Sequence, residues 1–182
     1  MVFTRMETSR LAIREFEAED WTSVHRYASD ERVTEHTLWG PNEEEDSVAF
    51  IQLCLEQQQK EDRTEYSLAV EKKETGTLIG GCNIIFMGSN AEIGYCFHPD
   101  YWGQGYASEA AAVMLQYGFD HLNVHRIYAT CRPGNIGSSK VMIRNGMTQE
   151  GLLREHIFYK GKYHSSYLFS VLKQEYQSLI NR

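Results

Sequence analysis

Alternating apolar and polar residues predict several short strands in the first half of the chain. Residues 11–16 read Leu-Ala-Ile-Arg-Glu-Phe, and two further strand-like runs cover 66–71 and 77–87, joined by a turn over 72–76. Another run, 91–97, follows directly after Gly-Ser-Asn. Period-two runs of this length, bounded by turn residues, are typical of strands. We therefore predict four strands here, the second and third forming a hairpin.

Apolar residues at helical spacing predict helices between these strands. The apolar stripe of a helix over 18–28 consists of Trp21, Val24 and Tyr27. A second helix is expected over about 43–60, with Asn42 as its N-cap. Its first turn is strongly acidic, and the positive end of the helix dipole favours acids there. We therefore interpret the acidic run as a helix start rather than a metal site.

The second half alternates strand and helix. It predicts, in order, a helix over roughly 105–121, a buried strand over 126–131, a short helix over 136–145 and a final hairpin with strands over 148–159 and 163–172. Gly146 stands where helices prefer a closing glycine. There is no internal repeat or Pro/Ser-rich linker, so we predict one α/β domain around a single core.

Composition and charge exclude several classes of protein. The chain has 182 residues, 42% of them apolar and 24% charged, which is typical of one soluble domain. We find no run of about 20 apolar residues and no secretory signal. The net charge of −7 without a basic cluster argues against direct nucleic-acid binding. Four cysteines without CxxC spacing and seven histidines without ligand spacing predict no metal site and a reducing cytoplasm.

The candidate chemistry begins at two glycines. Gly103 and Gly105 lie between a predicted strand and a predicted helix, where glycine serves either a tight turn or a phosphate-binding backbone. A dinucleotide site would need a third glycine, where Ser108 stands, and an acid about 20 residues further on, which is missing. The Walker lysine is missing as well. Coenzyme A remains as a ligand with a pyrophosphate.

Several motifs together resemble one enzyme family. The run Trp-Gly-Gln-Gly-Tyr-Ala over 102–107 resembles the Q/R-x-x-G-x-G/A signature of the GNAT acetyltransferases, and 135–147 resembles their N-x-x-S…K-x-G-F segment. Segments at 9–14, 91–95 and 150–155 resemble the RimJ/RimL-like branch, which acetylates N-termini of ribosomal proteins. The resemblance implies one GNAT domain over 1–182. Its sheet would be mixed, mostly antiparallel and twisted, with about seven strands and a V-shaped opening between the fourth and fifth.

The resemblance also implies roles for individual residues. Glu92 is the candidate base, although it could equally be a strand carboxylate that only structures the sheet. Ser138 is the candidate partner of the leaving thiol, or a hydroxyl that bonds to helix backbone. The implied acetyl-CoA contacts come from the strand end, the glycine turn and the next helix start, namely Cys96, His98, Gly103, Gln104, Gly105, Tyr106, Ala107, Ser108 and Asn135. Asn135 is also expected to be an N-cap.

The acceptor implied by the resemblance is a primary amine, with the N-terminus of a ribosomal protein as the leading candidate. Polyamines, antibiotics and metabolites are alternatives, as is a non-catalytic acyl-CoA-binding protein. The chain departs from the family pattern in Trp102, in Met142 where a tyrosine acid is common, and in Ser165 and Phe169 of the last strand. Histidines and tyrosines of the final hairpin could line an acceptor groove or pack a homodimer.

Overall fold

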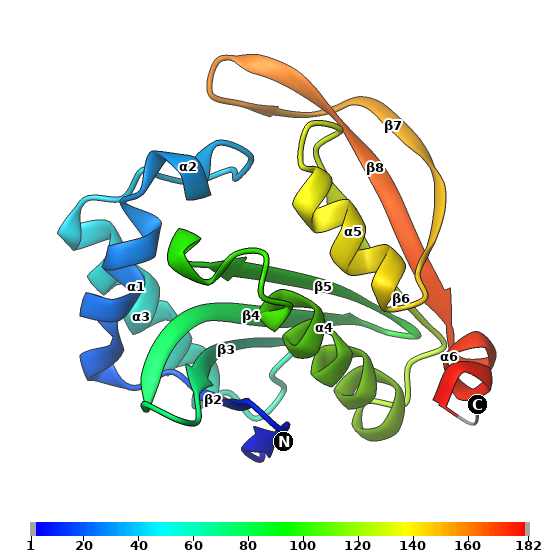
Figure 1. Cartoon of the computed structure of the whole chain (residues 1–182), viewed down its shortest axis with the longest axis horizontal. Helices are drawn as coiled ribbons and strands as arrows, with labels where there is room; N and C mark the ends of the chain where they lie inside the picture. Colours follow the sequence, from blue (N-terminus) through cyan, green and yellow to red (C-terminus); the bar gives the residue numbers. More distant parts are fainter. Residues whose placement is uncertain (1–2, 181–182) are drawn as a thin grey trace.

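The computed structural model describes residues 3–180 and places one eight-stranded sheet at the centre of the molecule (Figure 1). The strand order is β1-β2-β3-β4-β5-β6-β8-β7. The strands are β1 (Met6–Glu7), β2 (Leu11–Glu15), β3 (Glu65–Lys72), β4 (Thr77–Met87), β5 (Asn90–Phe97), β6 (Arg126–Cys131), β7 (Thr148–Tyr159) and β8 (Lys162–Leu172). All seven predicted strands are present, and β1 is an additional two-residue edge strand.

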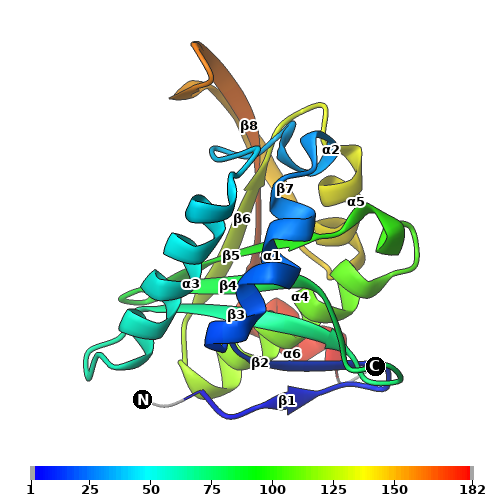
Figure 2. The ribbon, with the colours of Figure 1, turned by 90° about the vertical axis from the view of Figure 1, so that its left-hand side faces the viewer.

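Helices cover both faces of the sheet. They are α1 (Trp21–Ala28), α2 (Glu31–Thr34), α3 (Glu44–Gln58), α4 (Tyr106–Gln116), α5 (Ile136–Arg144) and α6 (Lys173–Ile180), with short 3-10 turns at Ala18–Asp20 and Pro99–Tyr101 and a π-helical turn over Tyr117–His121. Helices α1 and α3 lie on one face, and α4 lies on the other (Figure 2). No helix within residues 3–180 is long and apolar enough to cross a membrane.

One predicted helix cap was wrong. Helix α3 is capped by Glu43 and not by Asn42. Glu43 and Asp46 form a reciprocal capping box, in which the Glu43 backbone N–H donates to the Asp46 carboxylate at 3.0 Å. The Asn42 backbone N–H instead donates to the Ala28 carbonyl oxygen at 3.0 Å, which fixes Asn42 in the preceding loop. The sequence also gave no prediction of α2 or α6.

The sheet opens between β5 and β6, as the resemblance implied. These two strands form the parallel pair of the sheet, and their register covers only Asn90–Glu92 against Arg126–Tyr128. Beyond Glu92, β5 continues to pair with β4 alone, while β6 pairs with β8. The other strand pairs are antiparallel. The second half of β5 therefore has an open edge in the middle of the sheet.

Side-chain alternation sends the residues of β5 to two different faces. Ala91, Ile93 and Phe97 belong to the larger core, which packs between the sheet and α4. Glu92, Gly94 and Cys96 must then face the opposite side, where Cys96 packs against the smaller core under α1 and α3. The opening thus separates two chemically different sides of the sheet.

Candidate active site

A cavity of about 680 Å³ occupies the opening between β5 and β6. Four parts of the fold line it: α2 with the residues after it, the end of β5, the turn into α4 with its first residues, and the end of β6 with α5. This volume lies in the usual range for ligand-binding pockets of about 300–1,000 Å³. The predicted site residues that line it are Cys96, Gly103, Gly105, Tyr106, Ala107, Ser108, Asn135 and Ser138. Its lining does not include Glu92, His98 or Gln104.

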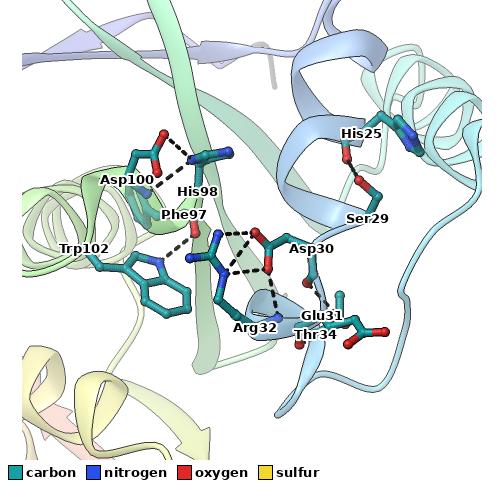
Figure 3. A network of polar contacts seen from close by, with 10 residues as sticks. All are labelled: His25, Ser29, Asp30, Glu31, Arg32, Thr34, Phe97, His98, Asp100 and Trp102. Carbon is teal, nitrogen blue, oxygen red and sulfur yellow. Dashed lines mark hydrogen bonds and ion pairs between the residues drawn. The ribbon is translucent and has the colours of Figure 1, made fainter.

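The turn into α4 requires glycine because of its backbone. Gly103 and Gly105 have φ values of +74° and +84°, in the left-handed region that other residues adopt only with strain. The Trp102 indole N–H donates to the Phe97 carbonyl oxygen at 2.8 Å, which ties the turn to the end of β5 (Figure 3). The Gln104 amide donates to the Asp100 carbonyl oxygen at 2.8 Å. The turn is therefore fixed with the N-terminus of α4 directed at the cavity, an arrangement that favours anions.

Arg10 supports this turn from the N-terminal segment. Its guanidinium donates to the Gln104 carbonyl oxygen at 2.9 Å, pairs with Glu109 of α4 at 2.5 Å and lies 4.5 Å from the centre of the Tyr106 ring. A Cβ atom on Gly105 would lie 3.4 Å from Arg10 Nη2. The sequence had shown Arg10 only as part of a family motif, so its contact with a turn 94 residues away was missed.

The first turn of α4 offers an additional polar group. The Ser108 hydroxyl oxygen is buried without a hydrogen-bond partner among the described residues, and Ser108 lines the cavity. Asn145, the C-cap residue of α5, donates to the Ser108 carbonyl oxygen at 3.1 Å, which joins α4 to α5. A buried hydroxyl without a partner is unusual in native proteins. Together with the free N–H groups of the helix start, it suits an oxygen-rich ligand.

Asn135 and Tyr95 fix Ser138 at the start of α5. Asn135 caps the helix as predicted, its side-chain oxygen accepting from the Ser138 backbone N–H at 3.0 Å. The Tyr95 hydroxyl of β5 lies 3.0 Å from the Ser138 hydroxyl and donates to the Ser138 carbonyl oxygen, also at 3.0 Å. Burial raises the pKa of Tyr95, so this phenol stays protonated. Met142, which stands where a tyrosine acid is common in the family, is buried in the core. The phenol hydroxyl next to Ser138 therefore comes from Tyr95 of β5 and not from α5.

Glu92 lies beside the opening on the other side of the sheet. It is the last β5 residue paired with β6, opposite Tyr128. Burial raises the pKa of the Glu92 carboxyl above its ordinary value, while Tyr128 and His156 act in the opposite direction. A carboxylate with a raised pKa is a stronger base than an exposed one. Neither Tyr128 nor His156 was a predicted neighbour, because strand pairing and a bulge in β7 bring them there.

The sequence matches the acetyltransferase (GNAT) domain family over residues 10–148. The chain belongs to the GNAT acetyltransferase family. It is 40% identical over 173 residues to YnaD, an uncharacterised N-acetyltransferase of Bacillus subtilis (strain 168), covering 93% of this chain and 97% of that protein. The crystal structure of a GNAT-family acetyltransferase from Bacillus anthracis is similar, with a TM-score of 0.84 and 34% identity over 94% of this chain and 99% of that one.

Two further similar structures have names that state an acceptor. A spermidine N-acetyltransferase from Vibrio cholerae, solved with CoA and spermine, is 25% identical with a TM-score of 0.79 and covers 93% of this chain and 99% of that one. A ribosomal-protein-S5-alanine acetyltransferase from Vibrio fischeri has a TM-score of 0.78 over 96% of this chain and 99% of that one. At 21% identity, the second likeness shows the shared fold alone.

GNAT acetyltransferases use acetyl-CoA, and the cavity of this enzyme suits such a ligand. The α4 turn and the Ser108 hydroxyl would hold the pyrophosphate, and the free edge of β5 at Cys96 would lie beside the pantetheine arm. Burial raises the pKa of Cys96 to about 12, which keeps it a thiol rather than a nucleophile. His98 accepts from the Asp100 backbone N–H at 3.2 Å at the end of β5 (Figure 3). His98 therefore stabilises the turn after β5 and does not line the cavity.

Proposed function

We propose that this acetyltransferase transfers an acetyl group from acetyl-CoA to a primary amine by direct attack in a ternary complex. The observation that carries the proposal is the separation of two sides at the opening between β5 and β6. Phosphate-binding features and the Ser138 and Tyr95 hydroxyls lie along the cavity, whereas Glu92 approaches the same opening from the other face. Two substrates can then enter from opposite sides and meet at Gly94–Cys96.

The proposed chemistry assigns one task to each side. The amine nitrogen attacks the thioester carbonyl carbon, the C–S bond breaks, and the amine loses its proton to Glu92, directly or through water. Backbone N–H groups on the free edge of β5 are suited to the developing oxyanion because they are already fixed in place. The leaving thiolate takes a proton or a hydrogen bond from Ser138, with the Tyr95 phenol behind it at 3.0 Å.

For the acceptor we propose the N-terminal amine of a protein, with ribosomal proteins as the first candidates. The support is the resemblance of three separate sequence segments, 9–14, 91–95 and 150–155, to the RimJ/RimL-like branch. A polyamine is the second candidate, since a spermidine N-acetyltransferase covers nearly the whole chain at 25% identity. A homodimer and a cytoplasmic location stay predictions.

The test is the release of CoA thiol from acetyl-CoA with a panel of acceptors. The panel contains peptides copied from ribosomal-protein N-termini, the same peptides with a blocked α-amine, and spermidine. We expect turnover that depends on a free amine, with the acetyl group located at the α-amine by mass spectrometry. Tight acetyl-CoA binding without turnover on any amine would instead favour the non-catalytic alternative. Thermal stabilisation by NAD but not by CoA would overturn the assignment of the α4 turn as a binding site for coenzyme A.

A further inference from the structure

A polar and aromatic cluster lies at the far end of the proposed acceptor side. Its Tyr159 and His164 belong to the hairpin residues expected to line an acceptor groove or pack a dimer, whereas Arg132 and Ser166 were not predicted. Arg132 follows directly after β6 and lines the cavity. One guanidinium nitrogen, Nη1, donates to the Ser166 hydroxyl of β8. The guanidinium lies 5.5 Å from the centre of the Tyr159 ring, and that ring stacks on His164 at 3.8 Å.

The strand register places this cluster on the same face as Glu92. Glu92 is opposite Tyr128, and Tyr128 is opposite Ser170 of β8. Ser166 lies four residues before Ser170 and therefore shares its face. Four residues of a strand span about 13 Å, so the Arg132–Ser166 contact lies about that far along the face from the candidate base.

The hydrogen bonding of this cluster is incomplete. Arg132 Nε and His164 Nε2 are both buried without a hydrogen-bond partner among the described residues. No carboxylate of residues 3–180 lies within ion-pair distance of Arg132. Arg132 as a whole is partly buried, and a charge that is partly removed from water is costly unless a counter-charge and its hydrogen bonds are supplied. A carboxylate can supply both, because it accepts two bonds from the planar guanidinium.

The rest of the fold encloses this end of the cavity. The β7–β8 hairpin arches past the end of β6 toward α2 (Figure 1), and Lys160 at its tip donates to the Thr34 carbonyl oxygen of α2 at 2.6 Å. His36, just after α2, would touch a Cβ atom on Gly134 at 3.4 Å. Lys160 follows Tyr159 and Gly134 lies two residues after Arg132, so both contacts are close to the cluster, in which Arg132 is partly buried.

The charges around the cavity also disfavour a polycation. The whole chain has a net charge of −7, yet the cavity lining contains four Arg or Lys side chains and a single carboxylate, that of Glu35. Arg32 is neutralised by Asp30 at 2.5 Å (Figure 3). Lys140 and Arg144 belong to α5, whose C-cap residue Asn145 is bonded to Ser108 in the first turn of α4, where the pyrophosphate would bind. Of the four cationic side chains that line the cavity, Arg132 is therefore the one that can bind the acceptor.

We infer that Arg132, oriented by Ser166 and Tyr159 and assisted by His164, binds a carboxylate of the acceptor. The acceptor is then a primary amine with a carboxylate less than about 13 Å away, since the amine must lie between Arg132 and Glu92. A free amino acid and a peptide with an acidic residue near its N-terminus both satisfy this chemistry, and spermidine does not. The inference rests on the proposed function and narrows its substrate class.

The test compares acceptors that differ only in one carboxylate. Initial rates of CoA release are measured with free glutamate, methionine and alanine against their carboxamides, and with peptides that begin Asp or Glu against the same peptides beginning Asn or Gln. We expect the wild-type enzyme to favour the carboxylate member of the amino-acid or the peptide pairs by about tenfold or more in kcat/KM, as expected for a charge-assisted pair. Which pairs show the preference identifies the source of the carboxylate.

Variants show whether Arg132 causes that preference. Arg132→Gln is expected to reduce the carboxylate-to-amide ratio to near one without changing KM for acetyl-CoA, and Arg132→Lys to keep only part of it, because a point charge lacks the planar fork. Ser166→Ala, which leaves the charge in place, is expected to lower the ratio partly. Arg26→Gln, the same change on the exposed side of α1, serves as the control and should alter nothing.

Two results would overturn the inference while leaving the acetyltransferase proposal intact. One is a wild-type enzyme that treats both members of every pair alike or prefers spermidine. The other is Arg132→Gln or Arg132→Lys with a fully retained preference. If none of the amines supports CoA release although calorimetry shows that acetyl-CoA binds, the proposed function is wrong, and the inference is wrong with it.

Discussion

Removing Arg10 should weaken acetyl-CoA binding as well as the fold, because Arg10 contacts the α4 turn directly. In Arg10→Gln the turn loses one charge-assisted hydrogen bond to the Gln104 carbonyl oxygen, and Glu109 loses its ion-pair partner while it still accepts from the Thr8 hydroxyl and the backbone N–H of residue 10. The side chain of Arg10 is 45% exposed, so its ion pair is worth only about 0–1 kcal/mol, and the hydrogen bond adds about 1 kcal/mol. We expect the free energy of unfolding to fall by about 1–2 kcal/mol, a shift of roughly 2–8 °C in Tm.

Binding is affected as well, because the same contacts hold the turn in the conformation proposed to bind acetyl-CoA. If about 1.4 kcal/mol of that support is lost, the competent population falls up to about tenfold, and the apparent Kd rises by the same factor. The Glu109 carboxylate, left without a counter-charge near the proposed phosphate site, adds repulsion. The double variant Arg10→Gln/Glu109→Gln should therefore bind acetyl-CoA better than Arg10→Gln alone.

Isothermal titration calorimetry with acetyl-CoA, beside thermal unfolding, measures both effects. The matched control is Arg5→Gln, which removes an exposed pair with Glu7 and touches no part of the α4 turn. If Arg10→Gln binds acetyl-CoA within twofold of wild type, or if Arg5→Gln loses as much affinity, the assigned role of Arg10 is wrong.

Two further predictions concern proton transfer. Glu92→Gln should lower kcat about 100-fold with KM for acetyl-CoA unchanged. Because the base acts when it is ionised, wild-type kcat/KM should rise with pH through the raised pKa of Glu92. A Glu92→Gln variant whose kcat/KM still rises over the same pH range would contradict the assignment. Because burial opposes ionisation of Glu92, the same variant should not be less stable at pH 7. Ser138→Ala should lower kcat while acetyl-CoA affinity stays intact. Tyr95 retains the Ser138 carbonyl as a partner, so the loss in the free energy of unfolding should stay near 1 kcal/mol. Unchanged turnover would mean that Ser138 has only a structural role.

Local chemistry made much of the fold predictable. Alternation, glycine positions and helix caps located all seven main strands, the α4 turn and the Asn135 cap, because these depend on residues a few positions apart. The errors arose where neighbours compete. Asn42 and Glu43 are both plausible caps, and the choice fell to Glu43 because the Asn42 backbone is bonded to Ala28 in another element. Helix α2, only four residues long, gave no periodic signal.

The family, the glycine turn at Gly103 and Gly105, and the candidate residues Glu92 and Ser138 could all be read from the sequence, since each signal is contained in a short segment. The tertiary structure alone decided which distant groups meet there. Arg10 reaches the α4 turn from 94 residues away, Tyr95 approaches Ser138 across the opening, and Arg132 meets Ser166 through strand pairing. Such contacts depend on strand register and on the separation of β5 from β6, which no local pattern encodes.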